Sequence, residues 1–480
     1  MDVDLPGTGV YVDGEHRAGV ERFPVLDPAT NEELTTVAEA GAPGVDAAVA
    51  SSERALAEWR DVDAGERREH LLALADAVRE HSEWLARLET TEVGRPISQS
   101  RALVTGAARY FEYYAGLTDK VEGETIPVPG DYLDYTVREP LGVTGHLVPW
   151  NVSLKLGARS FAPALATGNT LVVKPAPEAP LSLLAFAELA SEAGLPDGVL
   201  NVVPGDGPRT GAALTHDGRV RGLVFTGSRE TGELVAKAAA EHVIPVALEL
   251  GGKSPNVVFP DADLDRAAGD TLKAFMNAGQ VCHAGTRVFV HDDVYDAFVA
   301  DLVERTEAME VGPGETDPDV GPLVTAEARD RVADAVDAAV ADGARLLAGG
   351  HVPREGGNYY APTLLDGVDD DAAISCEELF GPVLTLYRFG SEAEVIERAN
   401  DTRYGLSAVV WTNDLSRAHR VAGAIEAGSV AVNEYPATFV EAPFGGYKES
   451  GLGREKGQQA IEHYTQLKNV AVRIDRPGEQ

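Results

Sequence analysis

The stretch GVTGHLVPWNVSLKLGARSFAPALATGNTLVVKP, residues 142–175, sets the pattern of this chain. It begins and ends with a short apolar run, and the segment between the two runs has the periodicity of a helix. The alternation continues through VLNVVPG (199–205), RGLVFTG (221–227) and VALELGG (246–252), with helix-like segments such as PLSLLAFAELASEAG (180–194) between them. Short apolar strands that alternate with helices predict βαβ units, in which helices cover both faces of a parallel sheet.

A second α/β region begins after Gly251. NVVF (256–259) and TRVFV (286–290) are expected strands, and DVYDAFVADLVERTEAM (293–309) is an expected helix. Upstream, residues 43–115 carry apolar side chains at helical spacing, which predicts helices packed on a surface. Because 480 residues exceed what one hydrophobic core holds, we predict an α/β fold with two domains and the chemistry between them.

Residues 118–140, TDKVEGETIPVPGDYLDYTVREP, differ from both regions. β-branched and aromatic residues interrupted by Pro-Gly predict a hairpin and not a core strand. Such an excursion needs a covering surface, which either a neighbouring subunit or the body of the same chain can supply.

Composition narrows the function classes. Lys and Arg number 41 against 77 Asp and Glu, a formal net charge of −36, so a nucleic acid partner is not expected. The chain has no apolar run of about 18 residues and does not begin like a signal peptide, so a cytoplasmic enzyme with no membrane partner is expected. The acidic, Lys-poor composition is typical of proteins from a high-salt cytoplasm, and an unusually acidic mesophilic protein is the alternative.

There are two cysteines, Cys282 and Cys376, which excludes a disulfide framework and a zinc site, so we expect no metal. Cys282 lies in NAGQVCHAGTRVFV (277–290), between a helix expected to end near Asn277 and a strand expected to begin near Thr286. A thiol at such a junction faces a cleft, where backbone N–H groups can stabilise a thiolate or an oxyanion. A buried, inert cysteine is the alternative.

Two polar residues follow expected strands. Glu249 ends the apolar run of VALELGGKSPN (246–256), where poor solvation raises the pKa of a carboxyl towards that of a general base. Asn151 follows the strand at 142–148 and can aim its amide at a developing oxyanion. A salt-bridged glutamate and a helix cap are the respective alternatives.

A possible phosphate-binding turn lies in VFTGSRETGELVAKA (224–238). A strand there is followed by Gly227, Gly232 and a helix, and free N–H groups at a helix start bind a dinucleotide pyrophosphate. The spacing Gly-x-x-x-x-Gly departs from the usual Gly-x-Gly-x-x-Gly, so the signal is weak by itself.

The joint order of the motifs is specific. PWN, TGNTLVVKP, FTGSRETG, ELGGKSPN, GQVCHAGTR, EELFGPV and PFGGYKESGLGRE occur in the order, and at about the intervals, of the aldehyde dehydrogenase superfamily, which this chain resembles from about residue 10 to 475. The resemblance implies a Rossmann-type dinucleotide-binding domain (1–117 and 142–249), an α/β catalytic domain (250–449), and a small β oligomerisation arm with a C-terminal tail (118–141 and 450–480). A homodimer or homotetramer is implied.

The resemblance also assigns roles. It implies that Cys282 is the nucleophile, Glu249 the general base for the hydrolytic water, and Asn151 the oxyanion donor together with the backbone N–H of Cys282. The reaction implied is oxidation of a small-molecule aldehyde to its carboxylic acid through a thiohemiacetal and a thioester, with NAD or NADP as cofactor. The implied cofactor contacts are Trp150, Lys174, Gly227, Ser228, Gly232, Glu378 and Phe380.

Two positions depart from the family pattern. NAD-preferring members often carry a glutamate three residues after Lys174, where this chain has Pro177. Without that carboxylate the 2′-phosphate of NADP is repelled less, so NADP is expected to be tolerated or preferred. Glu178 can partly substitute for the glutamate. His283 stands where many relatives have Thr or Cys, and it could tune the thiol unless its side chain points away.

Substrate contacts are assigned to two residues. Arg159 falls where semialdehyde dehydrogenases of this family place an arginine on the substrate carboxylate, which favours an ω-semialdehyde or an aromatic aldehyde. A structural, salt-bridged arginine is the alternative. Phe444 of the PFGG segment is the second candidate contact.

Three other functions compete. A CoA-acylating dehydrogenase of the same fold would transfer the acyl group to CoA, but such members lack the general-base glutamate. A non-catalytic relative would not need the set of Cys282, Glu249 and Asn151. A cysteine hydrolase would leave the dinucleotide motifs unexplained.

Overall fold

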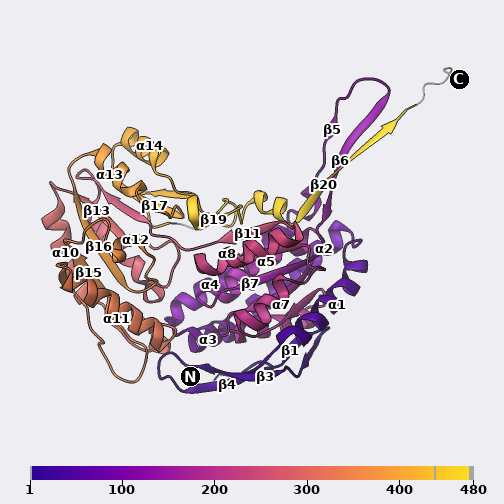
Figure 1. Ribbon diagram of the computed structural model, residues 1–480, viewed down its shortest axis with the longest axis horizontal. Coiled ribbons are helices and arrows are strands. Elements are labelled where there is room, and N and C mark those ends of the chain that lie inside the picture. Colours follow the sequence, from indigo (N-terminus) through magenta and orange to yellow (C-terminus); the bar gives the residue numbers. More distant parts are fainter. Residues whose placement is uncertain (1–2, 437–438, 475–480) are drawn as a thin grey trace.

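The computed structural model describes residues 3–436 and 439–474, and two α/β sheets make up its body (Figure 1). The first sheet has the strand order β2-β1-β9-β8-β7-β10-β11-β19. Its strands are β1 (Val10–Val12), β2 (Glu15–Arg17), β7 (Val143–Val148), β8 (Thr170–Pro175), β9 (Leu200–Val202), β10 (Gly222–Thr226), β11 (Val246–Glu249) and β19 (Gly451–Leu452). Strands β7 to β11 run parallel, which confirms the βαβ prediction, and β1, β2 and β19 add antiparallel edges.

Helices cover both faces of this sheet. One face carries α2 (Ala64–Glu80), α3 (Ser82–Val93), α4 (Ile97–Ala115), α5 (Ser153–Ala166) and α6 (Leu181–Glu192), and the other carries α1 (Gly41–Trp59), α7 (Ala212–Thr215) and α8 (Arg229–His242). Alternate side chains of β8 point to opposite faces: Leu171 and Val173 belong to the first core and Val172 to the second. A continuous apolar run is therefore what a strand buried on both faces requires. A separate hairpin, β3 (Glu21–Leu26) and β4 (Glu33–Glu39), lies near the N-terminus.

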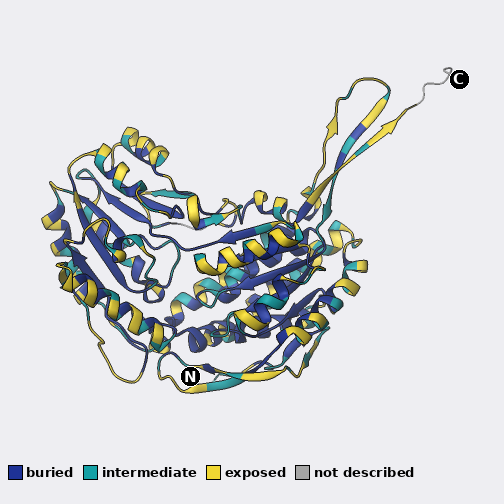
Figure 2. Cartoon of the chain, in the orientation of Figure 1, coloured by how far each residue is buried: buried dark blue, intermediate teal, exposed yellow. Residues whose placement is uncertain are grey.

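The second sheet has its own core, formed by strands that are dark blue in Figure 2. Its order is β14-β15-β16-β13-β12-β17-β18, and only β14 runs antiparallel to its neighbour. The elements are β12 (Pro255–Val258), β13 (Arg287–His291), β14 (Arg345–Ala348), β15 (Thr363–Asp366), β16 (Val383–Phe389), β17 (Ser407–Trp411) and β18 (Ser429–Val432), with α9 (Leu264–Thr271), α10 (Tyr295–Glu307), α11 (Ala326–Ala341), α12 (Ala373–Cys376), α13 (Glu392–Asn400) and α14 (Leu415–Ala424). The predicted α/β fold class is confirmed.

An antiparallel arm projects from the body (Figure 1). It consists of β5 (Thr125–Ile126), β6 (Tyr132–Pro140) and β20 (Thr465–Arg473). β20 pairs with β6 along its whole length, so the chain's own C-terminal segment supports the predicted hairpin. One part of the predicted tail lies elsewhere: β19 joins the first sheet beside β11 instead of the arm. Residues 1–2 and 475–480 of the predicted ranges lie outside the described residues.

Within residues 3–436 and 439–474, every helix falls short of the length and hydropathy that a bilayer crossing needs. The same residues contain no cluster of three or more His, Cys, Asp or Glu side chains arranged to hold a metal ion.

Candidate active site

A tightly bonded loop carries Cys282 from a 3-10 segment (Leu272–Gly279) into β13, as the sequence predicts. The backbone of Asn277 and Ala278 is left-handed, with φ of 49° and 54°. Gln280 is fully buried: its Nε2 donates to the carbonyl of Asn277 at 2.9 Å, and its Oε1 accepts from the backbone N–H of Val324 at 2.9 Å. Side-chain hydrogen bonds therefore hold this irregular loop in one conformation.

The thiol of Cys282 is half-buried, and its Sγ lies 3.9 Å from Nδ1 of His283. Burial raises the pKa of the thiol to about 12, against a smaller lowering by Arg159. These surroundings do not favour a resting thiolate, because loss of solvent raises the pKa of the thiol more than the nearby Arg159 lowers it. His283 turns towards the thiol, but burial lowers its pKa to about 3, so the imidazole is a poor proton acceptor.

Glu249 ends β11 in the first sheet and is 3% exposed. Its Oε2 has no hydrogen-bond partner among the described residues. Burial raises the pKa of this carboxyl to about 8, Arg159 lowers it and Glu455 raises it further. The raised pKa that its sequence context predicts is confirmed, and it matches a general base that acts near neutral pH.

Asn151 connects the first sheet to the Cys282 loop. Its Nδ2 donates to the backbone carbonyl of Gln280 at 3.0 Å, and its own backbone carbonyl accepts from Nδ2 of Asn277 at 3.3 Å. The N-cap of α5 is Val152 and no side chain caps this helix, so Asn151 is not the helix cap. An amide carries two N–H groups, and the one that Gln280 does not take remains for an oxygen beside Cys282.

The two glycines after Glu249 bring the halves of the site together. A Cβ on Gly252 would lie 2.6 Å from the backbone oxygen of Cys282, and a Cβ on Gly251 would overlap Oε2 of Glu378. Sequence reasoning assigned these glycines no role, although their position directly after the base is a usable signal, since only glycine permits so close an approach.

Lys174 ends β8 and is buried, and it has no ion pair in the described part of the chain. Burial lowers its pKa to about 8, while Glu178, Asp206 and Glu39 oppose this. Glu39 is also buried: one of its carboxylate oxygens pairs with Arg209 at 2.5 Å, and Oε1 has no partner. The Lys174 ammonium can donate to ribose hydroxyls and the free Oε1 of Glu39 can accept from them, which fits the predicted cofactor contact of Lys174. No sequence motif marked Glu39.

Pro177 and Glu178 line a cavity of about 280 Å³. Ser228 is the N-cap of α8 and accepts from the N–H of Thr231 at 3.3 Å, so its neighbours at the helix start keep free N–H groups for a pyrophosphate. Gly232, one turn further on, packs against Leu250: a Cβ there would lie 2.5 Å from the Leu250 side chain. Gly227 likewise packs on the ring of Phe225.

The other predicted cofactor residues gather beside the Cys282 loop. Glu378 accepts from the N–H of Gly252 at 3.1 Å, and burial raises its pKa to about 7. Phe380 has a φ of 54°, and its ring meets that of Trp150 edge-on at 5.6 Å. A second carboxylate close to the thiol fits the ribose at the reactive end of a dinucleotide.

The structure favours the structural alternative for Arg159. This residue is 3% exposed, its Nε pairs with Oε2 of Glu455, and its NH2 donates to Oγ1 of Thr226 at 3.0 Å. Two of the three guanidinium nitrogens thus have protein partners, and contact of Arg159 with a substrate carboxylate stays a prediction. Phe444 lies beside it, with the guanidinium carbon 5.7 Å from the ring centre, and remains a candidate substrate contact.

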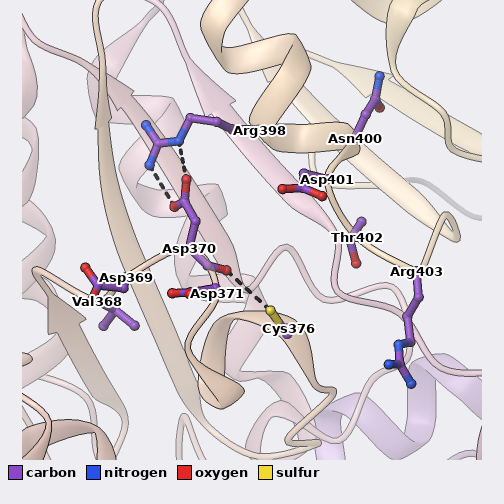
Figure 3. Close-up of a pocket in the computed structure, with 10 residues that line it drawn as sticks. All are labelled: Val368, Asp369, Asp370, Asp371, Cys376, Arg398, Asn400, Asp401, Thr402 and Arg403. Atoms are coloured by element: carbon purple, nitrogen blue, oxygen red, sulfur yellow. Dashed lines mark hydrogen bonds and ion pairs between the residues drawn. The ribbon is translucent and has the colours of Figure 1, made fainter.

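A cavity of about 830 Å³ lies apart from these residues (Figure 3). It is lined by Val368, Asp369, Asp370, Asp371, Cys376, Arg398, Asn400, Asp401, Thr402 and Arg403, none of them a predicted site residue. The carboxylate of Asp370 pairs with Arg398 at 2.7 and 2.9 Å, and its backbone carbonyl accepts from Sγ of Cys376 at 3.3 Å. Cys282 therefore has no second thiol in its site.

Comparison with known proteins covers nearly the whole chain. The sequence profile of the Aldehyde dehydrogenase family matches residues 15–470. Hydroxyisobutyraldehyde dehydrogenase of Mycolicibacterium austroafricanum is 44% identical over 474 residues, 97% of this chain and 94% of that protein. DhaS of Bacillus subtilis (strain 168), named as an aldehyde dehydrogenase, is 43% identical over 483 residues, 99% of this chain and 98% of that protein.

A solved structure agrees with these matches. The NAD+ complex of an aldehyde dehydrogenase from Bacillus cereus superposes with a TM-score of 0.96 at 41% identity, covering 98% of this chain and 97% of that one. The chain belongs to the aldehyde dehydrogenase family.

Proposed function

We propose that this NAD(P)-dependent aldehyde dehydrogenase forms a thioester on Cys282 and releases the acid product by hydrolysis. The observation that carries the proposal is the buried Glu249 carboxyl, with one unpaired oxygen and a pKa raised to about 8. Burying a carboxyl without a full set of partners costs stability, and groups of this kind cluster at functional sites. A hydrolytic step needs such a base, and transfer to CoA does not.

The chain's own residues account for the steps of this reaction. The thiol of Cys282 loses its proton to a base and its sulfur attacks the aldehyde carbon. The free N–H of the Asn151 amide and the backbone N–H of Cys282 stabilise the resulting oxyanion. When bound, oxidised nicotinamide supplies the hydride acceptor. Glu249 then takes a proton from a water molecule while the oxygen of that water attacks the thioester carbon. The carbon–sulfur bond breaks, the sulfur regains a proton to return as the thiol, and the carboxylic acid is released.

The test is a product assay with and without CoA. Aldehydes of several classes, including ω-semialdehydes and aromatic aldehydes, are supplied with NAD or NADP. We expect reduced nicotinamide and free acid in equal amounts without CoA. A strict requirement for CoA, with an acyl thioester as product, would overturn the proposal in favour of the acylating alternative.

Cofactor selectivity is expected to depend on Pro177. Replacing Pro177 with glutamate places a carboxylate at the cavity near Lys174, where it repels a 2′-phosphate and accepts from ribose hydroxyls. The ratio of kcat/KM for NADP to that for NAD should fall by at least about tenfold, because a close like charge costs more than about 1.4 kcal/mol. Pro177→Gln is the control of equal size without charge. An unchanged ratio in both variants would show that this position does not set the preference.

The arm supports a homo-oligomer. Large apolar side chains lie exposed on both of its long strands: Tyr132 and Leu133 on β6, and Leu467 and Val472 on β20. Covering these apolar side chains would remove them from water and so stabilise the arm. A second copy of the chain can supply the covering surface through a symmetric interface. The proposed assembly is a homodimer or homotetramer.

The charge of the chain supports adaptation to a high-salt cytoplasm. A net charge of −36 destabilises the folded state through self-repulsion. Raising KCl from about 0.1 M to about 1 M shortens the Debye length from about 10 Å to about 3 Å. We expect Tm to rise by several degrees over this range in thermal unfolding. Sucrose, which screens no charge, is the control, and a Tm that responds equally to both solutes would contradict the charge argument.

A further inference from the structure

A buried lysine without a carboxylate partner lies near the Cys282 loop. Lys456 is 3% exposed, and its Nζ lies 4.4 Å from the centre of the Phe444 ring. Backbone hydrogen bonds of 2.7 and 2.8 Å between Phe444 and Glu455 hold this lysine over that ring. In residues 3–436 and 439–474 no carboxylate forms an ion pair with it. A largely buried ammonium without a partner is unfavourable unless a ligand completes its contacts.

A second lysine approaches from α5. Lys155 lies one helical turn before Arg159, on the same face of the helix. Its side chain passes Gly106 of α4, where a Cβ would be 3.3 Å from its Nζ. No ion pair joins Lys155 to a carboxylate in the described part of the chain either. Two elements distant in sequence therefore each present an uncompensated cation.

Both lysines belong to the surroundings of Cys282. The ring of Phe444 lies 6.4 Å from that of His283, whose Nδ1 is 3.9 Å from Sγ of Cys282. Burial is the largest cause of the lowered pKa of His283, and the positive charges of Lys456, Lys155 and Arg159 lower it further. A chain of side-chain contacts therefore connects Lys456 through Phe444 and His283 to the thiol.

The cluster has three cationic groups, and only one of them has a carboxylate partner. Arg159 is paired with Glu455, whereas Lys456 and Lys155 form no ion pair in the described part of the chain. Burial, with repulsion from Arg159 and Lys155, lowers the pKa of Lys456 to about 7, and Glu249 and Glu455 oppose this. An anionic ligand would supply the missing partner and raise the pKa of the lysines, which favours their charged form.

We propose that Lys456 and Lys155 bind a carboxylate at the far end of the aldehyde substrate, a role that Arg159 cannot fill while it is paired with Glu455. The inference rests on the proposed function, because the aldehyde carbon must reach Cys282 while the carboxylate meets the lysines. Phe444 lies under Lys456 and forms the apolar wall between the lysines and Cys282. The substrate class is an aldehyde that carries a carboxylate.

The first test compares succinate semialdehyde with its methyl ester, which has the same chain without the charge. We expect wild-type protein to favour the semialdehyde in kcat/KM. Lys456→Met and Lys155→Met should each lower the ratio of the two kcat/KM values by about 10- to 100-fold, the effect of losing a charged hydrogen bond. Lys456→Arg should keep most of the ratio. The matched control is Lys237→Met on the exposed face of α8, where the ratio should equal that of wild type.

The second test does not depend on turnover. In a Cys376→Ala background the chain has one thiol, and its alkylation by iodoacetamide is followed with and without succinate. Succinate should slow alkylation of the wild-type site, and Lys456→Met should abolish this protection. The inference would be overturned if succinate gave wild type no protection, or if the ratio of the two kcat/KM values were the same in every variant as in wild type. Protection without turnover of any aldehyde would instead overturn the proposed function alone.

Discussion

Replacing Cys282 with alanine is expected to lower aldehyde oxidation by roughly 10⁴- to 10⁶-fold, the effect of removing the nucleophile from a covalent mechanism. Without the sulfur there is no thiohemiacetal, and the site contains no second thiol because Cys376 lies in a separate cavity. The measurement is formation of reduced nicotinamide under saturating aldehyde and cofactor. Hydrolysis of a simple ester, which would use the same sulfur, should disappear with it.

The control is Cys376→Ala, which removes the other thiol. It should retain activity within about twofold of wild type, since a change of surface side chain away from the site has little effect. If Cys282→Ala oxidised aldehydes at close to the wild-type rate, the covalent mechanism would be wrong.

Glu249→Gln is expected to lower steady-state turnover by about 10²- to 10⁴-fold, the usual contribution of a general base. Glutamine fills the same space but cannot accept a proton from water, so the thioester accumulates. A rapid-mixing experiment should still give a burst of reduced nicotinamide, followed by a slow phase. Loss of the burst would mean that Glu249 also takes the proton of Cys282, a step that the thiol's pKa of about 12 makes demanding.

The pH profile gives an independent check on Glu249. Its carboxyl must be ionised to act as a base, and burial raises its pKa to about 8. Activity in wild type should therefore rise with pH up to about 8 and level off above it, and fall as pH drops through that value. In Glu249→Gln the residual activity should lack this limb. A wild-type profile that is flat between pH 6 and pH 9, as from an unshifted carboxyl of pKa near 4.3, would contradict the buried base.

Local patterns in the sequence sufficed for the architecture. Apolar runs at 142–148, 169–175, 221–227 and 246–252 correspond to β7, β8, β10 and β11, because a strand buried on both faces leaves a continuous apolar signal. β13 after the Cys282 loop follows the same rule, and the hairpin of the arm lies where turn residues and β-branched residues predict it. Motif order also predicted that Cys282, Glu249 and Asn151 lie together. Asn151 and Glu249 are buried, and Asn151 bonds to Gln280 in the Cys282 loop.

Only the tertiary structure decided how these groups are charged and paired. Arg159 pairs with Glu455, almost 300 residues later in the chain, and this ion pair favours a structural role over the substrate contact that its position suggested. The unpaired state of Lys456, the proximity of Glu39 to Lys174, and the raised pKa of the Cys282 thiol arise in the same way. Burial and long-range neighbours set the cost of a charge, and neither has a signature within a short stretch of sequence. The sequence by itself therefore determined which chemical groups meet, and the tertiary structure determined what each of them can do.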